Sequence, residues 1–67
     1  MAILVSKEVR EGILAVRDTG RTNMFDVDAV KKIAYELGYE EAADWIENHE
    51  REYAVGIFEG FEVQTAE

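Results

Sequence analysis

The chain has 67 residues, of which 48% are hydrophobic, and a formal net charge of −8. At this length it forms one domain, residues 1–67, with a core only just large enough for independent folding. The sequence has no cysteine, which excludes disulfides and thiolate metal sites, and no apolar run reaches the roughly 20 residues that span a bilayer. We therefore expect a soluble, cytoplasmic protein without membrane contact.

The charge is divided unevenly along the chain. Residues 1–22 carry four basic and three acidic side chains, a net charge of +1, whereas residues 23–67 carry three basic and twelve acidic ones, a net charge of −9. A surface of that sign repels phosphate backbones, so nonspecific nucleic-acid binding is not expected. The simplest interpretation is that the charge keeps a small domain soluble.

Residues 1–5 form an apolar arm that is either a short strand or a segment lying over the helices. Ser6 is a typical N-cap, and Gly20 favours the left-handed backbone that ends helices, so the first helix is predicted over about 6–18. Apolar residues recur at helical spacing between these caps, at Val9, Ile13, Leu14 and Val16. Gly12 falls on the same face and indicates the close approach of another helix, since glycine otherwise costs about 1 kcal/mol there.

The stretch after the first helix is predicted to turn the chain into the second. Asn23 is a turn former, and Asp26 suits the N-cap of the next helix. Phe25 is expected to pack on Val30 as a hydrophobic staple, and Met24 to fill the gap between the helices. Both large apolar side chains of this corner should therefore be buried.

Two further helices are predicted in the rest of the chain. The first, over about 27–37, has a regular apolar face and ends at Gly38. The second covers about 40–59 and begins with two glutamates at its positive end. Its weak point is 48–50: the helix either runs unbroken to Glu59, with or without a kink there, or splits into two shorter helices.

Residues 61–67 form a C-terminal tail that begins with alternating apolar residues. Phe61 and Val63 would pair as a strand with Ile3 and Val5, either within the chain or across a dimer. A two-stranded ribbon is marginal in water, so it would have to lie on the helices. The predicted fold is therefore all-α, a small three-helix bundle with a short β pairing of the termini.

The corner after the first helix contains a polar signature, R-D-T-G-x-T-N-M-F-D, formed by Arg17, Asp18, Thr19, Gly20, Thr22, Asn23, Met24, Phe25 and Asp26. A weaker pattern consists of Glu52, Tyr53, Ile57, Phe58 and Gly60. Through these patterns, residues 9–60 resemble a family of short proteins from phages and prophages of Gram-positive bacteria, described as a domain of unknown function. The resemblance implies a phage-linked origin, in the cytoplasm of an infected or lysogenic host, and carries no activity or site residues with it.

Catalytic and metal sites have little support in the sequence. His49 is the only histidine, and a lone histidine near an apolar stripe is more often packed than catalytic. Asp26 and Asp28 lack the glycine and distal glutamate of a calcium loop, and no phosphate-binding glycine loop is present. We expect a protein that is not an enzyme and needs no cofactor or metal.

The second predicted helix, Gly38 and the third have the spacing of a helix-turn-helix. However, Asp44 and Glu47 fall where that motif buries apolar residues, and no basic residue precedes Arg51 in the would-be recognition helix. Direct nucleic-acid binding is therefore not expected. A different route to DNA would need the basic residues of the N-terminal part to converge on one face, and these are Lys7, Arg10, Arg17 and Arg21.

Four carboxylates on one side of the predicted third helix form the acidic face, which consists of Glu40, Glu41, Asp44 and Glu47. Such a row would imitate the phosphates of a duplex, and an acidic inhibitor of a host nucleic-acid-binding protein would use it. The alternative is a solvated face that only keeps the domain soluble.

Two other groups of residues are candidates for binding. The corner offers donors and acceptors at Arg17, Asp18, Thr22 and Asn23, although a purely structural turn accounts for them better. A homodimer contact would use the apolar residues near the termini, Ile3, Leu4, Phe58, Phe61 and Val63. The sequence thus leaves two hypotheses: a non-enzymatic phage accessory protein that binds another protein, and a structural or regulatory homodimerising module.

Overall fold

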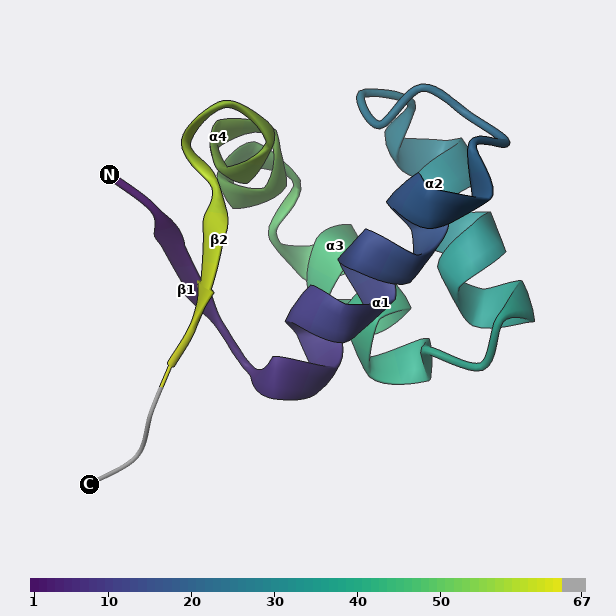
Figure 1. The fold of residues 1–67 in the computed structure, drawn as a ribbon, viewed down its shortest axis with the longest axis horizontal. Helices are drawn as coiled ribbons and strands as arrows, with labels where there is room; N and C mark the ends of the chain where they lie inside the picture. Colours follow the sequence, from purple (N-terminus) through teal and green to yellow (C-terminus); the bar gives the residue numbers. More distant parts are fainter. Residues whose placement is uncertain (65–67) are drawn as a thin grey trace.

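The structure is a computed structural model that describes residues 1–64; residues 65–67, the end of the predicted tail, lie outside the described part. The elements in chain order are β1 (Ile3–Val5), α1 (Lys7–Thr19), α2 (Val27–Glu36), α3 (Glu40–Asn48), α4 (Glu50–Glu59) and β2 (Phe61–Val63). In Figure 1 the two strands and α4 occupy one end of the molecule, and α1, α2 and α3 the other. Over residues 1–64, none of the helices has the length and apolar character needed to cross a bilayer.

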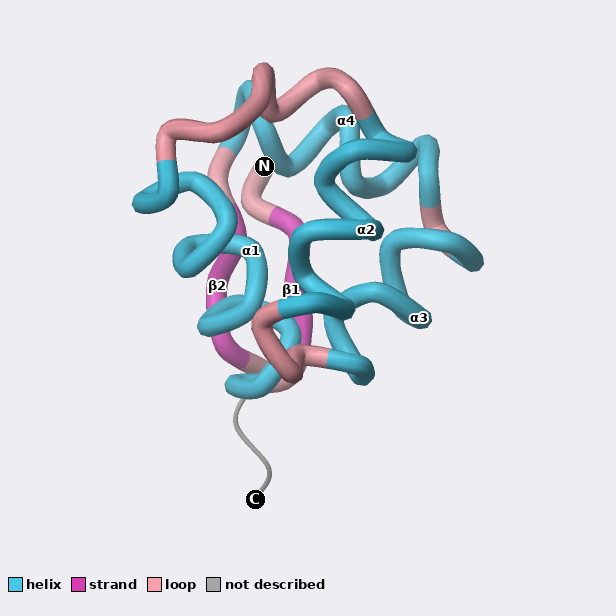
Figure 2. Tube along the Cα trace, turned by 90° about the vertical axis from the view of Figure 1, so that its right-hand side faces the viewer, coloured by secondary structure: helices cyan, strands magenta, loops and turns pink. Residues whose placement is uncertain are grey.

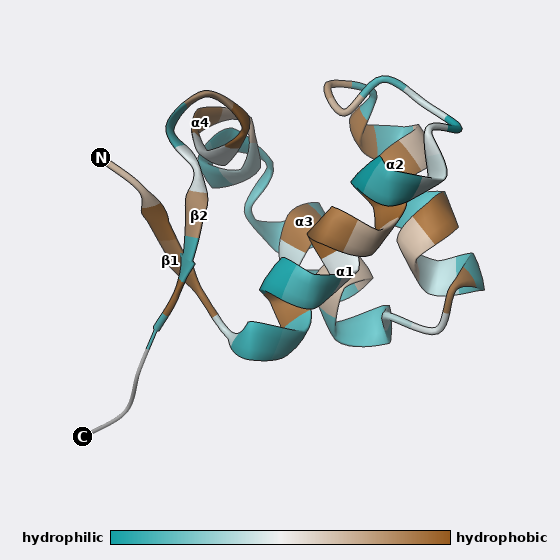
Figure 3. Cartoon of the chain, viewed as in Figure 1, coloured by the Kyte–Doolittle hydropathy of each residue, from teal (hydrophilic) through white to brown (hydrophobic). Residues whose placement is uncertain are grey.

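All four helices and the first strand contribute to one core. Its buried residues are Val5, Val9, Ile13, Val16, Val30, Ile33, Ala34, Ala42, Ile46 and Tyr53. Hydrophobic and hydrophilic residues alternate around the helices (Figure 3), as expected for helices that bury one side.

The ends of α1 and its contact with α3 follow the prediction. The Ser6 hydroxyl accepts a hydrogen bond from the Val9 amide at 3.2 Å, and Gly20 ends the helix with a φ of 65°. A Cβ atom placed on Gly12 would lie only 2.5 Å from the Cβ of Ala42 on α3. Because Gly12 has no side chain, the backbone of α1 can lie directly against the Ala42 side chain of α3.

The predicted third helix is in fact two helices, so the count of three is wrong. His49 separates α3 from α4 with φ −140° and ψ 47°, which are not helical angles. The break falls within the weak point predicted at 48–50, and it redirects α4 toward the corner. There the ring of Tyr53 is buried, and its hydroxyl donates to the Met24 carbonyl oxygen at 2.6 Å.

The two strands pair within the chain, in parallel, with Ile3 opposite Phe61 and Val5 opposite Val63. Figure 2 shows them side by side. Because side chains alternate along a strand, Ile3, Val5 and Phe61 face the helices, whereas Leu4 faces away and is 57% exposed. Val63, at the end of β2, is 37% exposed. The predicted pairing of the termini is confirmed.

The corner differs from the prediction at Phe25. Met24 packs against the core, but Phe25 is 49% exposed and its ring lies against Phe58, with the ring centroids 5.2 Å apart. The prediction that both side chains are buried is therefore wrong for Phe25, because α4 offers it a partner at the surface. Asp26 does cap α2, accepting from the Ala29 amide at 3.2 Å.

Candidate functional site

The acidic face lies on α3, and all four of its residues are exposed. The helical repeat places Glu40, Asp44 and Glu47 on one side, with Glu41 at the border of that side. None of the four takes part in an ion pair with the basic groups of residues 1–64. The face therefore presents negative charge that the described chain does not neutralise.

Glu41 differs from the other three because it also has a structural contact. Its carboxylate accepts a hydrogen bond at 2.9 Å from the hydroxyl of Ser6. Ser6 is the N-cap of α1, so this bond joins the beginning of α1 to the beginning of α3. The remaining three carboxylates make no side-chain hydrogen bond within the described chain.

A hollow of about 360 Å³ adjoins the acidic face, and Glu41 and Asp44 form part of its rim. Its apolar walls are formed by Leu4, Val5, Val9 and Trp45. A lysine or arginine side chain combines an aliphatic stem with a charged end, so it matches both the walls and the rim. The hollow can accept one basic side chain of a partner.

Trp45 is held in this wall by aromatic neighbours at the α3–α4 junction and in β2. The His49 ring stacks on the indole with centroids 4.8 Å apart, and the Phe61 ring meets it edge-on at 6.1 Å. His49 Nδ1 is also 2.9 Å from the Trp45 carbonyl oxygen. The histidine was predicted to lie on or near the apolar stripe; its ring does pack on Trp45, but the residue is exposed because the chain leaves the helical path there.

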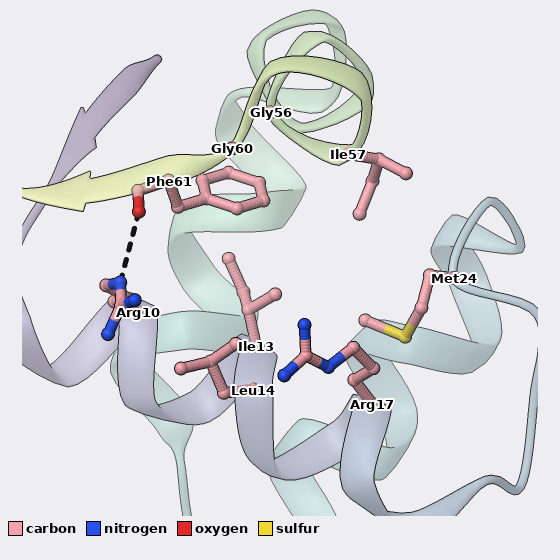
Figure 4. Close-up of a pocket in the computed structure, with 9 residues that line it drawn as sticks. All are labelled: Arg10, Ile13, Leu14, Arg17, Met24, Gly56, Ile57, Gly60 and Phe61. Carbon is pink, nitrogen blue, oxygen red and sulfur yellow. Dashed lines mark hydrogen bonds between the residues drawn. The ribbon is translucent and has the colours of Figure 1, made fainter.

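The candidate corner residues do not form one binding loop. The Asn23 side chain accepts from the Phe25 amide at 2.8 Å, and the Thr22 hydroxyl donates to the Asn23 carbonyl oxygen at 3.4 Å, so both hold the turn. Asp18 is exposed on α1. Arg17 points away from the turn into a separate groove beside α1 (Figure 4).

The five candidate dimer residues are also dispersed. Ile3 and Phe61 pack against the core within the ribbon, whereas Leu4 and Val63 are exposed. Phe58 is 79% exposed but lies against Phe25, away from the ribbon pairs. Only part of this set is therefore accessible to a second copy.

Two ionisable groups of the described chain have shifted pKa values. Burial raises the pKa of the Tyr53 phenol to about 12. The hydrogen bond from the Met1 ammonium, 2.6 Å from the carboxylate, and its positive charge lower the pKa of Glu59. Neither group belongs to the acidic face, and no cluster of three metal-ligating residues occurs among residues 1–64.

The hollow beside the acidic face was not predicted from the sequence. Its walls combine residues from β1, α1 and α3, which only the fold brings together. The one signal in the sequence was Trp45, a large aromatic residue at the edge of the apolar stripe rather than at its centre.

Comparison with known proteins identifies one family. Residues 5–60 match the model of a family described as "Domain of unknown function (DUF5049)". The matched segment contains all four helices and the corner. Comparisons with curated proteins and with solved structures give no match.

Proposed function

The chain belongs to the DUF5049 family of domains of unknown function, and on that premise we propose that it is a non-enzymatic accessory protein of phage or prophage origin that binds another protein. The observation that carries the proposal is the acidic face. Its carboxylates are exposed and form no ion pair within the described chain, so basic groups of a partner can pair with them without first displacing a basic group of this chain.

The proposed partner is a nucleic-acid-binding protein of the bacterial host, in the cytoplasm. Glu40, Asp44 and Glu47 follow each other at about 6 and 4.5 Å along the helix axis, given a rise of about 1.5 Å per residue. Phosphates of one DNA strand are spaced about 3.4 Å along the duplex axis. The three carboxylates therefore carry one negative charge for every one to two phosphates of a DNA strand. As an inhibitor, the protein would place them in the basic channel where its partner binds nucleic acid.

The hollow beside the acidic face adds a contact that depends on the shape of the partner's side chain. A lysine or arginine from the partner's channel would place its stem against Trp45 and Leu4, and its charged end at the rim beside Asp44. Hydrogen bonds to charged groups are stronger than those between neutral groups, and partial exclusion of water strengthens them further. This contact favours a specific partner over general attraction between opposite charges.

A matched pair of charge-reversed variants tests the proposal. Glu40→Lys with Glu47→Lys alters the acidic face and spares Glu41, which holds Ser6; Glu52→Lys with Glu62→Lys makes the same charge change at exposed positions outside the face. Proteins captured from host lysate are compared among wild type and the two variants. We expect one partner to be retained by wild type and the control, and lost with the altered face.

The interaction should also weaken steeply with salt, as expected for exposed charges, and a DNA duplex should compete for the captured protein. Retention of the same partner by the altered face, or failure of DNA to compete, would contradict the inhibitor proposal.

The alternative proposal is a structural or regulatory homodimer without inhibitory activity. The exposure of Leu4 and Phe58 supports it, since a second copy of the chain would remove these apolar side chains from water. Light scattering separates the two: a salt-insensitive dimer supports the homodimer, and a monomer that binds a host protein supports the first proposal.

A further inference from the structure

A second hollow, here called the arginine groove, lies between α1, α4 and β2 and has a volume of about 300 Å³. Its apolar walls include Ile13, Leu14, Met24, Ile57 and Phe61 (Figure 4). A volume of about 300 Å³ is at the lower end of the range for ligand pockets. The groove can therefore accept one large apolar side chain.

Two guanidinium groups, those of Arg10 and Arg17, also line the groove. The two residues are seven positions apart in α1, or two turns, which places them on the same side of the helix and about 10 Å apart along its axis. In Figure 4, Ile13 and Leu14 lie between them. Positive charge thus flanks the apolar walls along the groove.

Neither arginine is neutralised within the described chain. Arg10 donates from Nε to the Phe61 carbonyl oxygen at 3.0 Å and makes no further side-chain hydrogen bond there. Arg17 takes part in no side-chain hydrogen bond or ion pair with residues 1–64, although the sequence has 15 carboxylates. Guanidinium groups are weakly hydrated and bind carboxylates through two parallel hydrogen bonds.

We propose that the arginine groove binds an acidic segment of a partner protein in which a large apolar side chain stands between two carboxylates. In an extended peptide, residues i, i+2 and i+4 project to the same side, and i and i+4 are about 13 Å apart. The long side chains of Arg10 and Arg17 span that distance, while the central side chain enters the groove. The arginine groove would thus bind a negatively charged segment, whereas the acidic face would bind a positively charged surface.

Nuclear magnetic resonance with methionine methyl groups labelled with ¹³C provides a direct test. The probe is a peptide with the sequence Gly-Glu-Ser-Phe-Ser-Glu-Gly, blocked at both ends. We expect a saturable shift of the Met24 methyl signal, because Met24 lines the groove. The signal of Met1, which is 98% exposed and outside the groove, should not move and serves as an internal control.

Charge reversal identifies the binding residue. Arg17→Glu should weaken peptide binding by about tenfold or more, the scale of one charge-assisted hydrogen bond. Arg51→Glu makes the same charge change at an exposed position of α4 outside the groove, and should leave binding near the wild-type value. A peptide with lysine in place of both glutamates should bind Arg17→Glu more tightly than wild type.

Four results would overturn the proposal. The first is the absence of a saturable shift of the Met24 methyl signal. The second is that Arg51→Glu weakens peptide binding as much as Arg17→Glu does. The third is that wild type binds a peptide with serine in place of phenylalanine as tightly as the original peptide. The fourth is a wild-type dimer that Arg17→Glu dissociates, since a second copy of the chain would then occupy the groove.

Discussion

The phenol of Tyr53 links three parts of the molecule. It is buried in the core, its hydroxyl donates to the Met24 carbonyl oxygen in the corner, and its ring lies 5.9 Å from that of Phe61 in β2. A buried hydroxyl must keep its hydrogen bond, because an unpaired buried polar group is costly. One side chain therefore fixes α4 against both the corner and the ribbon.

Tyr53→Phe should lower the free energy of unfolding by about 1–2 kcal/mol at pH 7, since the Met24 carbonyl loses its donor. The pKa of Tyr53 is raised to about 12 in the folded state, against about 10 in an unfolded chain. The contribution of the Tyr53 phenol to the free energy of unfolding is therefore complete below pH 10. Between pH 10 and 12 it falls by at most about 1.4 kcal/mol per pH unit, because the unfolded chain loses the phenol proton and the folded protein keeps it.

Urea unfolding of wild type and Tyr53→Phe at several pH values measures this effect. The difference in stability between the two proteins should shrink as the pH rises above 10. A difference that stays constant to about pH 11.5 would show that the phenol is not buried as described.

At the scale of elements, the crossing of α1 and α3 depends on small residues. Gly12 and Ala42 meet where a Cβ on the glycine would lie 2.5 Å from that of the alanine and 2.9 Å from the Cβ of Tyr39. A contact this short leaves no room for a methyl group unless the helices move apart. The same crossing positions Glu41 to accept from Ser6, so the geometry of the acidic face depends on it.

Gly12→Ala should therefore destabilise the protein by about 1–3 kcal/mol through overpacking, even though alanine favours a helix by about 1 kcal/mol over glycine. Adding Ala42→Gly removes the nearer of the two clashing atoms and should recover part of the loss. Guanidinium unfolding of wild type, the single variant and the double variant measures both steps. An increase in stability with Gly12→Ala alone would mean that the helices separate without cost.

At the scale of the whole molecule, charge opposes compactness. The net charge is −8, and the described chain has only four ion-pair contacts, one of them made by the Met1 ammonium. Exposed pairs contribute little, whereas a large net charge destabilises the folded state through self-repulsion. We expect strong repulsion on the acidic face, where four carboxylates without an ion pair lie on one short helix.

Salt should therefore stabilise the protein. Raising sodium chloride from about 0.01 to 0.3 M shortens the Debye length from about 30 Å to below 8 Å, and we expect the melting temperature to rise by a few degrees. Glu40→Gln with Glu47→Gln should raise the melting temperature at low salt and reduce the salt effect. A melting temperature that falls on addition of salt would indicate that attractive pairs outweigh repulsion.

Local sequence signals predicted much of the fold because they act between neighbouring residues. The cap residues Ser6 and Asp26, the left-handed Gly20 and the helical stripes all appear where expected. The close approach at Gly12 was also predicted, since a glycine on the apolar face of a helix is tolerated mainly where a neighbouring element packs closely. The alternation in Phe61 and Val63 predicted the correct strand partners, because period two fixes which side chains share a face.

Tertiary structure decided what depends on residues far apart in sequence. The break at His49 was one of two alternatives in the sequence, and packing of Tyr53 and Trp45 against distant partners selects it. The outward position of Phe25 follows from where α4 lies.

The sequence by itself determined the acidic face, because the helical repeat alone places Glu40, Asp44 and Glu47 on one side of α3, with Glu41 at its border. It did not determine the hollow beside that face or the arginine groove. Both are formed where elements from opposite ends of the chain meet, so their shape depends on long-range packing that no local pattern encodes.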